Sequence, residues 1–253
     1  MKDTKQLTYE YALHLGDNAW VLSHRLAEWC SNGPILEEDL AITNFALDLI
    51  GRAQGLYRYA AELEGRGRTE DDLAYRRNER QYYNNLLVEV PNGNFATTMA
   101  RQLYMSTFEY YFYSALMNSK DETLAALAAK TLKEVKYHMA HASDWVVRLG
   151  DGTAESHYKM QEALNDLWMY TGELFEMNET DAALAEQGIG VDLAKLYPEW
   201  QQRITEVITN ATLTLPYAEY MQTGGRKGVH TEHLGHMLCE MQYLQRAYPD
   251  AKW

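Results

Sequence analysis

Four long segments of this chain repeat apolar residues every three or four positions, and this periodicity constrains the fold more than any other feature. The segments cover about residues 7–30, 36–64, 94–118 and 121–150. Such spacing places the apolar side chains on one face of an α-helix. Because the chain has only five prolines and 46% hydrophobic residues, it can build long uninterrupted helices around a full core.

Each predicted helix has an apolar stripe, which we expect to face the core. On the second helix the stripe contains Leu40, Thr43, Leu47, Ile50, Gln54, Tyr57 and Ala61. On the third helix it contains Met99, Leu103, Thr107, Tyr110 and Met117. On the fourth helix it contains Leu124, Leu127, Thr131, Val135, His138, Ala142, Trp145 and Leu149.

The connections between the helices predict the topology. Short polar turns at residues 31–34 and 119–121 make two antiparallel hairpins. Residues 66–93, about 28 in number, link the hairpins and form a connection longer than an ordinary bundle turn. Two hairpins joined by one long crossover form a ferritin-like topology. We therefore predict an all-α fold, a ferritin-like four-helix bundle with a C-terminal helical extension.

Beyond Gly150 the helical pattern is weaker. We expect helices at about residues 153–175, 192–211 and 231–248, and loops at about 176–191 and 214–228. No Gly/Ser-rich or charged linker separates this part from the rest. The sequence therefore predicts one domain over residues 1–253, with a core bundle at about 7–150 and the extension at about 151–253.

Composition and simple motifs exclude several classes of function. A net charge of −13 argues against nucleic acid and against an anionic membrane surface as partners. The start of the chain has no apolar signal region, and no apolar run of 18 residues occurs, so a cytoplasmic location is expected. Cys30 and Cys239 fit free thiols of a reducing compartment. Walker, Rossmann and serine-hydrolase motifs are absent from the sequence.

None of the eight histidines has Glu or Asp three residues before it. Di-iron proteins with this helix layout use two such Glu-x-x-His pairs and a lone Glu on each of two other helices. At that spacing the second helix has Gly51, which has no ligand atom, and Gln54, whose neutral amide is a poor iron ligand. In the fourth helix Val135, which has no ligand atom, stands three residues before His138. We predict no metal site at these four degenerate positions.

His138 is expected to be a core residue, hydrogen-bonded to Glu134 or Glu109. One alternative stays open at this point. The chain could be an independent di-metal oxidase or an iron-binding ferritin-like protein with an unusual ligand set, Glu28, Glu109, Glu134 and His138.

The predicted crossover contains a basic cluster in an otherwise acidic chain. Its members are Arg66, Arg68, Arg76, Arg77 and Arg80, followed directly by Gln81, Tyr82 and Tyr83. Arginine suits phosphate oxygens, and flat aromatic rings suit an adenine or acyl group. Residues 76, 77 and 80–83 are therefore candidate contacts for a ligand with phosphate and adenine or acyl groups. The alternative is a solvated loop in which the arginines pair with neighbouring carboxylates.

Near the C-terminus, His230, His233 and His236 follow one another at three-residue steps. On a helix the first and third diverge, so one ion cannot easily bind all three, although a weak Zn or Ni site is an alternative. Thr231 fits the N-cap of an amphipathic helix. His230, Thr231, Glu232 and His233 are also candidate residues of a partner interface.

Several motifs resemble those of a known family over nearly the whole chain. They lie at residues 16–18, 26–30, 46–51, 85–95, 133–138, 230–235 and 240–248. Together they are similar to the structural, non-catalytic subunit of bacterial ring-1,2-phenylacetyl-CoA epoxidase, a multicomponent monooxygenase of phenylacetate degradation.

The resemblance implies a structural subunit without a catalytic residue or cofactor of its own. A paralogous catalytic subunit would hold the di-iron site, and a reductase would supply electrons from NADPH. The implied partners are this catalytic subunit, the other epoxidase subunits and the coenzyme A portion of phenylacetyl-CoA. The candidate contacts for this coenzyme A portion are Arg76, Arg77, Arg80, Gln81, Tyr82 and Tyr83. The resemblance also allows this chain to form homo-oligomers in the absence of the other subunits. Carrying the catalytic subunit's Glu-x-x-His positions across gives Gly51/Gln54 and Val135/His138, of which only His138 is a metal-ligand type.

Overall fold

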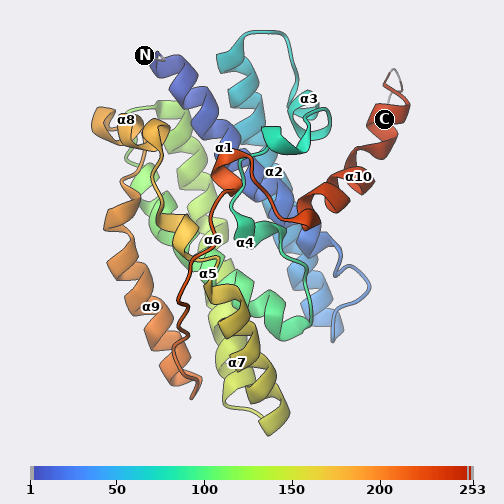
Figure 1. Ribbon diagram of the computed structural model, residues 1–253, viewed down its shortest axis with the longest axis vertical. Helices are drawn as coiled ribbons and strands as arrows, with labels where there is room; N and C mark the ends of the chain where they lie inside the picture. The colour runs from blue at the N-terminus through green and yellow to red at the C-terminus, as the bar shows by residue number, and fades with distance from the viewer. Residues whose placement is uncertain (1–2, 250, 252–253) are drawn as a thin grey trace. The chain divides into compact units, whose positions relative to one another are not determined.

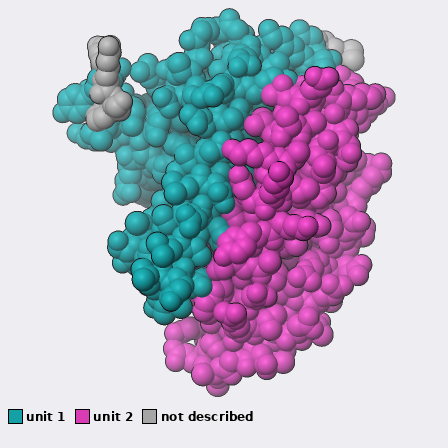
Figure 2. Space-filling model, turned by 180° about the vertical axis from the view of Figure 1, so that it is seen from behind, with its two compact units in different colours: residues 1–91, 224–253 teal, residues 92–223 magenta. Residues whose placement is uncertain are grey.

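The computed structural model describes residues 3–249 and 251. Every regular element in this part of the chain is a helix. The helices group into two compact units, residues 1–91 with 224–253 and residues 92–223 (Figure 2). The all-α, ferritin-like fold class expected from the sequence is confirmed. The organisation as a single domain stays a prediction.

The first unit is built on the antiparallel pair α1 (Thr4–Ala27) and α2 (Leu36–Glu64), which pack along their lengths (Figure 1). Asp3 caps α1 by accepting the Gln6 N–H at 2.8 Å. Gly65 ends α2 in the left-handed conformation, with φ of 70°, where glycine has no Cβ penalty. Gly16 lets the helices approach, because an added Cβ would lie 2.7 Å from the Tyr57 ring.

The crossover is more ordered than the sequence indicated. It contains α3 (Glu70–Tyr75), the 3₁₀ turn η1 (Glu79–Gln81) and α4 (Leu86–Glu89). The same unit includes the 3₁₀ turn η4 (Gly225–Lys227) and α10 (Glu232–Ala247), which packs against α3 and η1. A Thr69–Asp72 capping box begins α3.

The second unit centres on the pair α5 (Phe95–Leu116) and α6 (Glu122–Gly150), with α7 (Ala154–Trp168) and α9 (Tyr197–Asn210) packed on both. The 3₁₀ turns η2 (Gly172–Phe175) and η3 (Leu193–Lys195) and α8 (Glu179–Gln187) complete it. Trp200 is fully buried, and its Nε1 donates to the Tyr104 carbonyl at 3.0 Å. Aromatic rings from four elements gather around it, namely Tyr104, Trp168, Phe175 and Tyr197.

Three expectations about elements were wrong. The loop expected at about residues 176–191 contains α8, which Asn178 caps by accepting the Asp181 N–H. The helix expected to reach residue 175 ends at Trp168, and η2 follows separately. The first helix ends at Ala27, so Trp29 and Cys30 lie in the turn.

The stripe predicted for α2 was wrong over most of its length, although Tyr57 and Ala61 are buried as expected. Leu40, Leu47, Ile50 and Gln54 are exposed, and the buried face instead contains Ile42, Phe45, Ala46, Leu49, Ala53 and Leu56. On α5 Met99, Leu103 and Thr107 are buried as expected, but the helix is buried almost all round rather than on one side. Met117, which follows the helix, is exposed. The stripe of α6 is largely confirmed, with Leu124, Thr131, Val135, His138 and Ala142 buried.

Candidate functional site

Helix α2 presents a second apolar face to solvent. Leu36, Leu40, Leu47 and Ile50 are 71%, 56%, 60% and 38% exposed, and adjacent Ile35 is 51% exposed. At 3.6 residues per turn these four positions lie on one side of the helix, opposite the buried Ile42 and Leu49. A helix with apolar side chains on two opposite faces can bury one in its own core and the other against a partner. We call Leu36, Leu40, Leu47 and Ile50 the outer face of α2.

The four degenerate metal positions lie in two different environments. Gly51 and Gln54 are exposed on α2, where the Gln54 amide donates to Glu70 at 3.4 Å. Val135 and His138 are buried on α6. Glycine and valine have no ligand atom, and Gln54 is a neutral amide at the surface, so these residues do not fit a di-iron centre. Within the described residues no group of three or more His, Cys, Asp or Glu side chains could hold a metal ion.

The alternative ligand set is divided between the two units. Glu28 belongs to the first unit and is exposed, with Arg25 at 2.7 Å, whereas Glu109 and His138 are buried in the second unit. Glu134 is partly exposed on α6. A hydrogen bond from His138 to Glu134 or Glu109 stays a prediction.

The basic cluster does not form one surface. Arg76 pairs with Asp72 at 3.3 Å, as the solvated-loop alternative expected, whereas Arg66 and Arg68 pair with Glu64 at the end of α2. Arg77 and Tyr82 are buried, 3% and 0% exposed, so they are not surface contacts for a coenzyme A portion. Arg80 and Gln81 are exposed, and Tyr83 is partly exposed. For them and for Arg76, contact with substrate stays a prediction.

Arg77 is instead the centre of a buried polar network. Its guanidinium forms a bidentate ion pair with the Asp17 carboxylate, and Tyr57 donates its hydroxyl to the same carboxylate at 2.7 Å. Arg77 also lies over the Tyr82 ring, 4.1 Å from its centroid. Burial alone would lower the pKa of Arg77, but the charge of Asp17 raises it, so the guanidinium stays protonated. Burial raises the pKa of Tyr82 to about 12.

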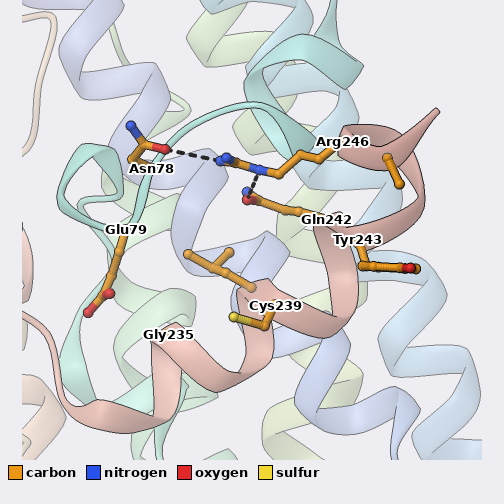
Figure 3. A pocket seen from close by; sticks show the side chains of 9 residues that line it. Asn78, Glu79, Gly235, Cys239, Gln242, Tyr243 and Arg246 are labelled. Carbon is orange, nitrogen blue, oxygen red and sulfur yellow. Dashed lines mark hydrogen bonds between the residues drawn. The ribbon is translucent and has the colours of Figure 1, made fainter. Parts of the chain in front are cut away.

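Helix α10 completes this network. The Gln242 amide donates to the Arg77 carbonyl at 3.0 Å and to the Tyr82 hydroxyl at 2.9 Å. Arg246 donates to the same carbonyl at 2.8 Å and to Asn78 at 3.2 Å. Both side chains line a groove of about 590 Å³ between α10 and η1, with exposed Tyr243 on the α10 side (Figure 3). The groove also contains Cys239, which is exposed and free, as is Cys30.

The predicted C-terminal interface residues have different environments. The His230 side chain is fully buried against Glu89, so it is not a surface residue for a partner. Thr231 is at the N-cap position of α10, but its side chain makes no capping hydrogen bond. Glu232 is exposed and His233 is partly exposed, and for these two an interface role stays a prediction.

The network, the Glu89–His230 pair and the outer face of α2 were all missed from sequence. The ion pairs join residues 60 and 141 positions apart, which local periodicity cannot connect. The outer face did have a signal, because α2 is apolar at two opposite sets of helical positions.

These observations define an all-α, ferritin-like protein with an exposed apolar helix face and no fit to a di-iron centre at the degenerate positions. The chain belongs to the family of phenylacetic acid catabolic proteins, which matches residues 1–253. It is similar to one of the subunits of 1,2-phenylacetyl-CoA epoxidase from Escherichia coli (strain K12), with 52% identity over 248 residues, 98% of this chain and 99% of that protein. The family expected from the motifs is confirmed. Among the described helices, none is long and apolar enough to cross a membrane.

Proposed function

We propose that this chain is the non-catalytic structural subunit of a phenylacetyl-CoA 1,2-epoxidase complex that acts in aerobic phenylacetate catabolism. Its similarity to a subunit of such an epoxidase supports the complex, and the outer face of α2 supports the structural role. The outer face is the observation that carries the proposal, because an apolar helix face in solvent marks an interaction surface. The proposed partner is the catalytic paralogue that holds the di-iron site.

The outer face is well suited to an obligate contact. Burying one leucine or isoleucine side chain stabilises a complex by roughly 1.5–3 kcal/mol. Leu36, Leu40, Leu47 and Ile50 repeat along one side of α2, so they can pack against a partner helix over several turns. The opposite side of α2 is fixed in the core by Phe45 and Leu49. A rigid face of this kind would hold a bound partner in one geometry.

In this proposal the oxygen chemistry belongs to the partner. Bound iron would supply oxygen activation there, with electrons from NADPH through a reductase, and this chain would contribute binding energy and shape. Gly51, Gln54 and Val135 have no group suited to iron, which is why no catalytic step is assigned to this chain. The proposed location of the complex is the cytoplasm.

Metal content and turnover test this function together. The chain is expressed alone and with its catalytic paralogue in iron-rich medium, and iron is measured in each purified sample. We expect no iron in the chain alone and about two per heterodimer, as a di-iron centre requires. Stoichiometric iron in the isolated chain would support the di-metal oxidase alternative. Full turnover by a stable catalytic paralogue alone would refute the structural role.

A further inference from the structure

Both ring nitrogens of His230 face hydrogen-bond acceptors. Nδ1 lies 3.0 Å from Oε2 of Glu89, and Nε2 lies 2.9 Å from the carbonyl oxygen of Tyr82. A neutral imidazole donates from one nitrogen only, so its other nitrogen would oppose an acceptor lone pair. The imidazolium form donates from both. The side chains of His230 and Glu89 are fully buried, which leaves no solvent to relieve a mismatch.

The same carboxylate fixes the start of α10. Oε1 of Glu89 accepts the N–H of Thr231, the N-cap residue of α10, at 2.6 Å. A negative charge at the N-terminus of a helix is favourable, because the helix dipole is positive there. Oε2 also accepts from the Asn84 amide at 3.0 Å. Glu89 on α4 therefore holds His230 and the first turn of α10 through one buried anion.

From this geometry we propose that Glu89 and His230 form a proton-dependent latch, which holds residues 224–249 against the crossover and releases them when His230 loses its proton. We call residues 224–249 the C-terminal arm. It contains η4 and α10, and its later contacts, from Gln242 and Arg246 to the Arg77 carbonyl, lie beyond the latch. Deprotonation would leave a buried carboxylate facing a neutral ring and would remove one of the two donors.

The charges around His230 favour the protonated form. Burial alone would lower its pKa, but the hydrogen bond and charge of Glu89 outweigh burial and raise the pKa above the ordinary value near 6.5. The Tyr82 carbonyl and the Asp17 carboxylate on α1 act in the same direction. On the cationic side, Arg77 is paired with Asp17, and Arg25 donates to the Glu89 carbonyl at 2.7 Å.

The direction of the pH dependence follows from the raised pKa of His230. When folding raises a histidine pKa, the stability is fully present below the unfolded pKa and is lost as the pH rises through the folded value. The latch is therefore closed near pH 6.5 and opens on the alkaline side. If folding raises the pKa of His230 by one pH unit, loss of the proton lowers the equilibrium ratio of closed to open arm roughly tenfold.

Hydrogen exchange of the full chain tests the latch between pH 6.5 and pH 9.5, with labelling times corrected for the pH dependence of intrinsic exchange. We expect peptides of the arm to lose protection with rising pH, while peptides of α1 do not. His230→Gln cannot carry a positive charge and should show low arm protection that no longer depends on pH. His236→Gln is the matched control, because that histidine is exposed on α10 in the same arm, and it should behave as the unaltered chain.

Nuclear magnetic resonance of the His230 ring in the unaltered chain gives a second readout that does not depend on a variant folding. At pH 6, below the ordinary pKa, we expect protons on both Nδ1 and Nε2, and the ring should lose one of them over the same pH range in which the arm loses protection. A single ring proton at that pH, or arm protection that is the same at both ends of the pH range, would overturn the latch. Neither measurement uses the catalytic partner, so failure of the latch can be distinguished from failure of the proposed function.

Discussion

At the scale of single residues, the most consequential group is the buried ion pair between Asp17 and Arg77. A buried ion pair is weak evidence for net stability, but removing one partner leaves an uncompensated charge in the core. Here the pair joins α1 to the segment after α3, and Tyr57 and the Tyr83 N–H, at 2.8 Å, satisfy the rest of the carboxylate. The neighbouring Arg76, by contrast, is about half exposed and pairs with Asp72 at the surface.

These two adjacent arginines form a matched pair for mutation. Arg77→Ala should lower the free energy of unfolding by about 3–5 kcal/mol, because the Asp17 carboxylate stays buried without its partner. Arg76→Ala should cost less than about 1 kcal/mol, since exposed pairs contribute little. Urea denaturation followed by circular dichroism measures both. Equal effects at the two positions would contradict the buried network.

At the scale of elements, α2 shows how one helix can have two roles. Its inner face, with Phe45 and Leu49, packs in the core, and the outer face is left for a partner. Periodicity alone detects both faces, since each repeats at helical spacing, but it does not say which one is covered. Burial energy decides that question, and it depends on which residues the rest of the chain brings near.

Substitution on the outer face tests its assignment to a partner. Leu40→Ser with Leu47→Ser should weaken binding to the catalytic paralogue by about a hundredfold or more, because two side chains worth roughly 1.5–3 kcal/mol each leave the contact. The stability of the isolated chain should barely change, since both residues are already exposed. Calorimetric titration measures the affinity. Tyr158→Ser, at an exposed position on α7, is the control and should leave the affinity unchanged.

At the scale of the whole molecule, the chain begins and completes its first unit with segments far apart in sequence. Residues 1–91 form most of this unit, and residues 224–253, which follow the second unit in the sequence, also belong to it. The arm buries Leu234, Met237 and Leu238 and supplies Gln242 to the core network. The arm is therefore part of the packing of the first unit.

Deletion of residues 224–253 should destabilise the first unit. Roughly 1.5–3 kcal/mol is lost for each buried apolar side chain, and the apolar surface left behind should bind a hydrophobic dye. Urea denaturation and dye fluorescence measure the two effects. Tyr243→Ser, at an exposed position on α10, should change neither. A truncated chain with an unchanged urea midpoint and no dye binding would contradict the structural role of the arm.

By itself, the sequence determined the helices and the family. Apolar periodicity, turn residues and caps act over a few positions, so α1, α2, α5, α6 and α10 could be predicted to within a few residues, whereas the short α8 was missed. The motifs that identify the family are likewise local. The unsuitability of Gly51 and Val135 for iron also follows from residue type alone, without any structure.

Only the tertiary structure decided which side of α2 is buried and which polar residues meet. Asp17 and Arg77 are 60 positions apart, and Glu89 and His230 are 141 apart, so nothing in their local sequence links them. Arg77 has the same local pattern as Arg76 and Arg80, yet it is a core residue and they are at the surface. The physical reason is that desolvation and pairing depend on neighbours in space, and long-range packing alone supplies those neighbours.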